Sequence, residues 1–406
     1  MTSPTVQDTQ AIGASRAPRS GRLLLWVLDA ASRDWQGRGL VIQAPGGHEH
    51  RFGPPSPDPA RLEINDWRFV RRALASGDIG LADGYVAGEW TTPDLARLLA
   101  VLADNFERLD RFANGNPFGR AVNWMVHRLG RLNTRSGSKR NIIAHYDLGN
   151  AFYERWLDPS MTYSSALWTR PEMSLEAAQR EKYAALAASI DLRPEHRVLE
   201  IGCGWGGFAE YAAREIGCRV VGLTISPAQH RFAVERMERA GLSDKVDIRL
   251  TDYRDVADTF DRVVSIEMFE AVGEQWWSTF FAVLRDRLAP GGRAGLQIIT
   301  IRDDLFADYR KRVDFIQKYV FPGGLLPSEA RLREEIAPHR LTIDGIRRFG
   351  QDYARTLHLW ASQFQAADSG MNEPFDRQWL FYLAYCEAGF STGRTNVIHI
   401  GLSRDD

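Results

Sequence analysis

Residues 198–208 read Val-Leu-Glu-Ile-Gly-Cys-Gly-Trp-Gly-Gly-Phe, an apolar run that breaks into four closely spaced glycines. The apolar residues before the glycines predict a buried parallel strand, and those from Phe208 onward predict an amphipathic helix. Glycines in such a turn let the backbone take positive φ and approach a ligand, while free N–H groups at the helix start face that ligand. We therefore expect a nucleotide-like cofactor against Gly202, Gly204 and Gly206.

The next predicted strand, residues 219–226, distinguishes between two cofactors. A dinucleotide domain would end this strand with an acidic residue for the ribose hydroxyls, and the sequence has none there. Glu200, at the end of the preceding strand, can instead face the ammonium group and the sulfonium charge of S-adenosylmethionine. Neutral groups able to hydrogen-bond a ribose follow at Thr224, Ser226 and Gln229. The pattern favours S-adenosylmethionine over a dinucleotide or a purely structural turn, and the lack of Lys or Arg in the turn counts against a P-loop.

The composition is that of a globular protein without bulk attraction to nucleic acid. Of 406 residues, 44% are apolar and 25% are charged, and the formal net charge is −1. Cys203, Cys218 and Cys386 show no metal-binding spacing, so no metal site is expected, and they suit a reducing cytosol. No stretch resembles a signal peptide or reaches transmembrane length. We expect a cytoplasmic protein that would act on lipid from the inner face of the membrane.

The patterns predict two domains joined by a basic segment. Residues 1–20 are rich in Ser, Thr, Pro, Ala and Gln, which predicts disorder. Residues 21–113 predict a small α+β accessory domain, suited to docking or to a homodimer contact. Residues 114–140 interleave Arg and Lys with Trp, Met and Leu and contain no acid, which fits an interfacial membrane helix or, equally, a linker helix with solvated arginines. Alternating strands and helices over 141–406 predict an α/β fold with a doubly wound, mostly parallel Rossmann-like sheet.

An aromatic-rich stretch of predicted helices, about 303–390, precedes the last predicted strand at 397–402. Its rings include Trp360, Phe364 and Trp379. An insertion at this point of the fold lies over the carboxyl edge of the sheet, where it would enclose an apolar chamber for an acyl chain beside the cofactor. A plain hydrophobic core explains many of the same rings equally well.

Five sequence blocks occur in a fixed order along the chain. They are His-Tyr-Asp-Leu-Gly-Asn at 145–150, Leu-Asp-Pro-Ser-Met-Thr-Tyr-Ser-Ser-Ala at 157–166, the glycine turn at 200–207, Ser-Ile-Glu-Met-Phe-Glu-Ala-Val-Gly at 265–273 and Gln-Lys-Tyr-Val-Phe-Pro-Gly-Gly-Leu-Leu-Pro-Ser at 317–328. Together they resemble the cyclopropane fatty acid synthase family, from about Gly77 to the C-terminus. Residues 84–90 and 383–390 resemble a longer subgroup, which includes enzymes that make methylene- or methyl-branched fatty acids.

The resemblance implies methyl transfer from S-adenosylmethionine to a cis double bond in a phospholipid acyl chain. The alkene attacks the sulfonium methyl and becomes a carbocation, and a base then removes a proton. Loss of a proton from the new methyl closes a cyclopropane ring, whereas loss from a neighbouring carbon leaves a methylene branch. In the family, a bound bicarbonate ion is thought to be the base. We expect ring closure and keep the methylene branch as the alternative.

The resemblance also assigns site residues one position at a time. Around the implied bicarbonate it places Glu270, Tyr353 and the backbone of Ile299. Ser165 and Gln297 stand where many members have Cys and His, and neither side chain supplies the charge of a protonated imidazole, so weaker anion binding is expected. The cofactor contacts that it adds are Tyr146, Tyr163, Ser164, Ile266 and Glu267.

The residues give an independent, less specific argument for two of these positions. Glu270 follows a predicted strand, so it lies at the carboxyl edge of the sheet, where a carboxylate among aromatic rings can stabilise a carbocation. A salt-bridged surface acid is the simpler alternative. Asp252 and Tyr253 follow the third predicted strand, where an acid can reach the adenine amine and a flat ring can stack on the base. Asp252 is otherwise a helix N-cap.

Two other functions use the same features. A small-molecule or nucleic-acid methyltransferase has the same fold, and the near-zero net charge and the aromatic stretch count against nucleic acid. A membrane-associated lipid-binding protein with a vestigial cofactor site would have no need of Glu200 and the intact glycine turn.

Overall fold

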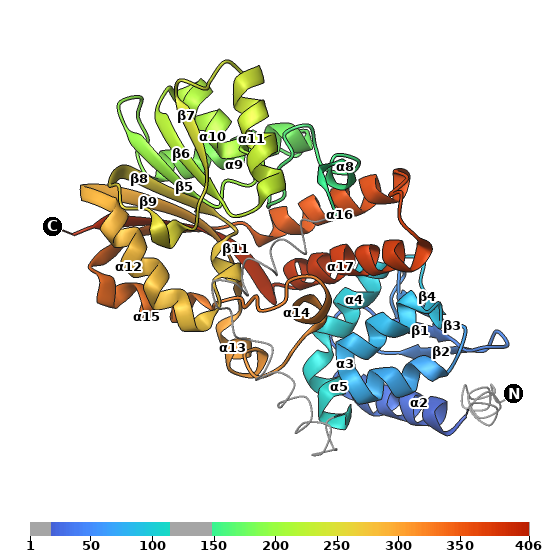
Figure 1. The fold of residues 1–406 in the computed structure, drawn as a ribbon. Coiled ribbons are helices and arrows are strands. Elements are labelled where there is room, and N and C mark those ends of the chain that lie inside the picture. Colours follow the sequence, from blue (N-terminus) through green and yellow to red (C-terminus); the bar gives the residue numbers. More distant parts are fainter. Residues whose placement is uncertain (1–17, 114–147, 406) are drawn as a thin grey trace, which may run out of the picture. The chain divides into compact units, whose positions relative to one another are not determined.

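The computed structural model describes residues 18–113 and 148–405, which separate into two compact units (Figure 1). Among these residues, the smaller unit combines 18–113 with Met371–Thr392, and the larger unit contains the remainder. The basic segment at 114–140 and Tyr146 lie outside the described residues, so the expectations for them stay predictions.

The smaller unit is built on a four-stranded sheet in the order β2-β1-β3-β4. Strand β1 pairs parallel to β3 and antiparallel to β2, and β4 pairs antiparallel to β3. The strands are β1 (Leu40–Gln43), β2 (Glu49–Phe52), β3 (Ala60–Ile64) and β4 (Trp90–Thr91), and the helices are α2 (Arg19–Ala31), α3 (Arg68–Val86), α4 (Leu95–Asp104) and α5 (Phe106–Ala113). The prediction of disorder through residue 20 is wrong for Arg19 and Ser20, which begin α2 and form its first turn.

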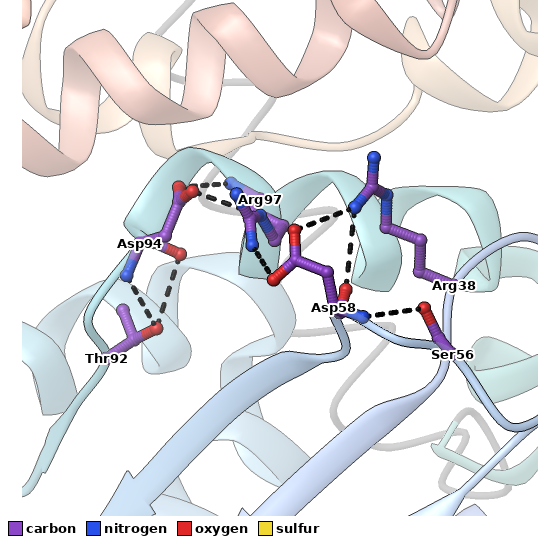
Figure 2. Close-up of polar contacts among 6 residues, drawn as sticks. All are labelled: Arg38, Ser56, Asp58, Thr92, Asp94 and Arg97. Carbon is purple, nitrogen blue, oxygen red and sulfur yellow. Dashed lines mark hydrogen bonds and ion pairs between the residues drawn. The ribbon is translucent and has the colours of Figure 1, made fainter.

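Polar contacts fix a loop of this unit against the start of α4 (Figure 2). The Asp94 carboxylate caps the helix by accepting a hydrogen bond from the backbone N–H of Arg97 at 2.9 Å. Asp58 accepts from Arg38 at 3.1 Å and forms a second, shorter ion pair with Arg97. Because 55% of the Asp58 side-chain surface stays exposed, each pair contributes at most about 1 kcal/mol. These contacts position a loop and suggest no chemistry.

Helix α17 (Glu373–Ser391) belongs to the smaller unit, although the sequence places it in the insertion of the other domain. Its Phe381 ring packs on Tyr85 and Trp90, at centroid distances of 5.9 and 6.5 Å. The Arg377 guanidinium donates to the carbonyl oxygen of Tyr85 at 2.8 Å. The predicted insertion of 303–390 is therefore wrong at its C-terminal end, because an apolar helix pattern does not say which distant surface the helix covers.

The larger unit contains a seven-stranded sheet in the order β10-β11-β9-β8-β5-β6-β7 (Figure 1). Strands β5 to β9 run parallel, and β11 lies antiparallel between β9 and β10. Their bounds are β5 (Arg197–Ile201), β6 (Arg219–Thr224), β7 (Val246–Leu250), β8 (Phe260–Ile266), β9 (Leu288–Ile301), β10 (Leu341–Arg348) and β11 (Thr395–Arg404). This arrangement confirms the predicted doubly wound, mostly parallel sheet. Strand β10 corrects the prediction that the stretch from 303 to 390 is helical throughout.

Both faces of this sheet are buried, which explains the nearly continuous apolar strands. Val198 and Val264 belong to a core cluster with helices α9 (Leu175–Ser189) and α11 (Pro227–Arg239). Their chain neighbours Leu199 and Val263 belong to a second cluster, with α12 (Trp277–Arg287) and α15 (Glu329–Ile336). Successive residues of a strand point to opposite faces, so the two clusters lie on opposite sides of the sheet. The remaining helices of the unit are α8 (Asn150–Tyr153), α10 (Gly207–Tyr211), α13 (Asp303–Tyr309), α14 (Phe315–Tyr319) and α16 (Gly350–Ala366).

Candidate active site

The glycine turn forms as predicted between β5 and α10. Gly202, Gly204 and Gly206 have φ of 81°, 54° and 84°, a region that favours glycine. A Cβ atom at Gly202 would lie 2.7 Å from the Met268 side chain, so that glycine is needed for packing. A Cβ atom at Gly204 would meet no described atom within 4 Å. The Gly204 side of the turn is therefore open to a ligand.

Glu200 lies at the end of β5 with only 2% of its surface exposed. Its Oε2 has no hydrogen-bond partner among the described residues. Burial raises the pKa of Glu200 to about 8, and the positive charge of Lys182 opposes this rise. A cationic ligand beside the turn would restore the charge of the carboxylate, so the site fits the ammonium or sulfonium group that the sequence suggests.

The three neutral residues predicted to bind a ribose come together after β6. The Thr224 hydroxyl donates to Gln229 Oε1 at 3.0 Å, and both side chains are buried. The Ser226 hydroxyl caps α11 by accepting from the backbone N–H of Gln229 at 3.4 Å. The backbone N–H of Gly202 donates to the Leu223 carbonyl at 3.0 Å, which joins this group to the glycine turn.

Asp252 shows the capping role considered for it. Its carboxylate accepts a hydrogen bond from the backbone N–H of Arg254 at 3.0 Å. It also forms an ion pair with the Arg254 guanidinium at 2.5 Å. The neighbouring Tyr253 ring packs edge-on against Phe280 at 5.6 Å. Contacts of Asp252 and Tyr253 to an adenine remain predictions.

A second group of polar residues surrounds the carboxylate of Glu267, directly after β8. The backbone N–H of Ser165 donates to Oε1 at 2.9 Å, and Gln297 Nε2 donates to the same oxygen at 2.7 Å. The Tyr353 hydroxyl donates to Oε2 at 2.6 Å. The structure thus brings together three residues predicted to hold an anion and places Glu267, predicted as a cofactor contact, among them. The Ser165 side chain contributes nothing here, because its hydroxyl donates to the Ala166 carbonyl at 2.9 Å.

Glu270 lies beside this group in the 3₁₀ turn Phe269–Ala271. Its Oε1 accepts from the backbone N–H of Ile299 at 2.5 Å, and its buried Oε2 has no hydrogen-bond partner among the described residues. Burial, followed by the nearby charge of Glu267, raises the pKa of Glu270 to about 8. The described contacts of Glu270 include no ion pair, so the alternative of a salt-bridged surface acid finds no support.

This environment predicts a pH-dependent stability term. Because the folded-state pKa of Glu270 is raised, the native state holds a proton that the unfolded state has lost, and this contribution disappears as the pH rises from about 5 to about 8. Glu270→Gln cannot titrate, so the variant should gain stability relative to the parent over that window, by at most about 1.4 kcal/mol per pH unit. Urea unfolding at several pH values measures the difference. A difference that is constant with pH would contradict the prediction.

Lys182, on α9, is a site residue that the sequence analysis missed. Its side chain is fully buried, and Nζ donates to the Ser164 hydroxyl at 2.6 Å. Burial lowers the pKa of Lys182 to about 7, against the charges of Glu267, Asp158 and Glu200. One feature of the sequence could have identified Lys182. It lies four residues before Leu186, on the face of the helix that is expected to be buried.

A row of aromatic rings links the glycine turn to the Glu267 group. Trp205 in the turn packs on Tyr153 at 5.1 Å, and Tyr153 packs on Tyr163 at 5.4 Å. Tyr163 packs on Trp360 at 5.4 Å, and Trp360 packs edge-on against Tyr353 at 6.2 Å. The rings pack on one another as a hydrophobic core does, so a chamber for an acyl chain remains a prediction. The roles of Tyr163, Ser164 and Ile266 as cofactor contacts also remain predictions.

Comparison with known proteins identifies the family. The family model of mycolic acid cyclopropane synthetase matches residues 133–400. The chain belongs to this family. Curated members include the tuberculostearic acid methyltransferase UfaA1 of Mycobacterium tuberculosis, which is 37% identical and aligns with 83% of this chain and 81% of its own. The cyclopropane-fatty-acyl-phospholipid synthase of Escherichia coli K12 is 36% identical, over 85% of this chain and 88% of its own.

Solved structures of family members have the same fold. The cyclopropane synthase MmaA2 of Mycobacterium tuberculosis matches with a TM-score of 0.62 and 30% identity, over 66% of this chain and 98% of its own. The mycolic acid cyclopropane synthase CmaA1, solved with S-adenosylhomocysteine (SAH) and CTAB, matches with a TM-score of 0.62 and 29% identity. The match covers 66% of this chain and 98% of CmaA1. These matches confirm the resemblance and the predicted fold class.

Proposed function

We propose that this protein transfers a methyl group from S-adenosylmethionine to a cis double bond in a phospholipid acyl chain and closes a cyclopropane ring. The observation that carries the proposal is a pair of adjacent acidic side chains, Glu267 and Glu270, on the same sheet edge as an open glycine turn. Similarity to the Escherichia coli synthase along most of both chains supports the substrate class.

The residues at the turn fit S-adenosylmethionine. Gly204 leaves space for close approach, and the unpartnered oxygen of Glu200 suits the positive ammonium and sulfonium groups. Thr224 and Gln229, after the neighbouring strand, supply polar groups that can hydrogen-bond ribose hydroxyls. The co-substrate supplies an electrophilic methyl group on its sulfonium.

The second group of residues suits the cation that forms on the acyl chain. Carboxylates and aromatic faces stabilise positive charge, and a site that excludes water strengthens both effects. Tyr353 and Trp360 provide rings next to the Glu267 carboxylate, and both side chains are buried. The same surroundings protect the cation from water.

A methylene or methyl branch is the second candidate product. UfaA1, which has the higher sequence identity of the two relatives above, is named a tuberculostearic acid methyltransferase, and its name mentions no cyclopropane ring. Ser165 and Gln297 depart from the common family residues where the proton is removed. The carbon from which the cation loses its proton decides between the two products.

Incubation with labelled S-adenosylmethionine and vesicles of a cis-unsaturated phospholipid tests the proposal. We expect acyl chains one CH₂ heavier that resist ozonolysis. Ozonolysis-sensitive chains of the same mass would establish the methylene branch instead. Vesicles of saturated phospholipid are the control and should gain no label. Label in neither lipid, with the co-substrate bound, would contradict the proposed function.

The proposal includes work at the cytoplasmic face of the membrane. Within residues 18–113 and 148–405, no helix has both the length and the apolar character needed to cross a bilayer. In this proposal the basic segment 114–140 brings the protein to the lipid surface. A homodimer remains a prediction.

A further inference from the structure

The Glu267 carboxylate is held by donors that point at it from three separate parts of the chain. Ser165 precedes α9, Gln297 lies within β9, and Tyr353 lies in the first turn of α16. Ser165 and Gln297 are at most 1% exposed, and Tyr353 is 7% exposed. Glu267 itself is partly buried, and these three donors hold both of its carboxylate oxygens in place.

The orientation of the Gln297 amide is determined by the neighbouring strand. His399 on β11 faces Gln297 across the sheet, and its Nε2 lies 2.9 Å from Gln297 Oε1. Burial lowers the pKa of His399 to about 3, so the ring is neutral and its single N–H is donated to that oxygen. The amide NH₂ group of Gln297 is then directed at Glu267.

The donor set distinguishes Glu267 from Glu270. Glu267 accepts three hydrogen bonds, from a backbone N–H, an amide NH₂ and a phenol O–H. Such bonds to its oxygens favour the ionised carboxylate over the protonated acid. Burial raises the pKa of Glu267, and these hydrogen bonds together with the positive charge of Lys182 oppose that rise. Glu270 accepts one backbone hydrogen bond and lies close to the Glu267 charge, so it is the member of the pair that keeps a proton.

The backbone at Glu267 is unusual for a residue with a side chain. Its φ is 50°, and its N–H donates to the Gln297 carbonyl at 2.9 Å. A non-glycine residue in this region costs roughly 1 kcal/mol or more, and such strain persists where the surrounding structure enforces it. The strained position is the one that presents the carboxylate to its donors.

We infer that Glu267 is the proton acceptor of the reaction, so that the protein carries its own base and requires no bound bicarbonate. This inference rests on the proposed function. The π electrons of the alkene form the new C–C bond to the methyl carbon, and the electrons of the S–C bond stay on sulfur. Glu267 then takes a proton from the cation. The electrons of the broken C–H bond close the ring, and the proton passes from Glu267 to water after the product leaves.

The groups that the family resemblance assigns to bicarbonate are already engaged by the protein. Three of them donate to Glu267, and the backbone N–H of Ile299 donates to Glu270. A further anion would have to displace one of these carboxylates and add a negative charge to a site that already contains two acids.

The test measures turnover of cis-unsaturated phospholipid vesicles in buffer freed of bicarbonate, with and without added bicarbonate. The parent protein should turn over equally in both. Glu267→Gln keeps hydrogen-bonding groups at this position but accepts no proton, so turnover at saturating S-adenosylmethionine should fall roughly 10²- to 10³-fold while the variant still binds the co-substrate. Glu267→Gly leaves space for a small anion, and added bicarbonate should restore part of its turnover.

Glu270→Gln is the matched comparison, because it replaces an acid with the same amide three residues further along the chain. We expect it to lose less than about tenfold in turnover, since Gln resembles the protonated acid. Calorimetric binding of S-adenosylmethionine shows that each variant is folded.

Three results would overturn the inference while leaving the proposed function intact. They are a parent that needs added bicarbonate, a Glu267→Gln variant with parental turnover, and a larger loss from Glu270→Gln than from Glu267→Gln. A parent that binds S-adenosylmethionine and never modifies lipid would overturn both.

Discussion

Replacing Gly204 with Val is expected to weaken S-adenosylmethionine binding by at least about 100-fold, or roughly 2.7 kcal/mol. The valine methyl groups would occupy the open space beside the turn, where the described residues leave room for the ligand. They would also hold the nearest backbone away from the ligand. No atom of the described residues lies within 4 Å of the new Cβ, so the chain should stay folded with a modest loss of stability. Calorimetric titration and thermal unfolding measure the two effects separately.

Gly241→Val is the matched control. Gly241 follows α11 with φ of 67°, and a Cβ atom there also meets no described atom within 4 Å. The conformational cost of the two substitutions is therefore similar, about 1 kcal/mol or more. Gly241→Val should lose stability and keep the parental affinity. Parental affinity in Gly204→Val would remove the glycine turn from the binding site.

Trp360→Ala is expected to lower the free energy of unfolding of the larger unit by about 3 to 5 kcal/mol. The indole is fully buried and packs on Trp156, Tyr163 and Tyr353, so its removal leaves a cavity that these rings fill only in part. Turnover per folded molecule should also fall, because Tyr353 loses the ring that orients its hydroxyl toward Glu267. Urea unfolding, followed by assays in conditions where the variant is folded, measures both losses.

Trp90→Ala provides the comparison in the smaller unit. Trp90 is also fully buried, between the rings of Tyr85 and Phe381, and a similar loss of stability is expected there. The affinity for S-adenosylmethionine should be unchanged, since the candidate cofactor residues lie in the larger unit. A loss below about 1 kcal/mol for Trp360→Ala would contradict the packing argument.

Local patterns were sufficient for the glycine turn and the parallel strands. Glycine at 202, 204 and 206 matches positive φ at each position, and strands buried on both faces give unmistakable apolar runs. Strand β10 was missed because it lies at the sheet edge and most of its residues are partly or fully exposed. Its alternation of apolar and polar residues is therefore weak.

The site was predicted as a set of residues but not as an arrangement. Family resemblance named Ser165, Gln297 and Tyr353, which lie far apart in the sequence. Only the fold shows that their hydrogen bonds converge on Glu267 rather than on Glu270. Lys182 was missed because lysine is seldom fully buried, so its identity alone predicts a solvated position.

The pairing of His399 with Gln297 has a consequence for synthesis of the protein on the ribosome. Strand β11 lies antiparallel between β9 and β10, and pairing between strands so far apart in the sequence forms slowly compared with local helices. The nascent chain is able to form the glycine turn early, while Gln297 Oε1 lacks its His399 partner until Thr395–Arg404 has left the exit tunnel. The cofactor turn would then be complete before the hydrogen bonds around Glu267 are.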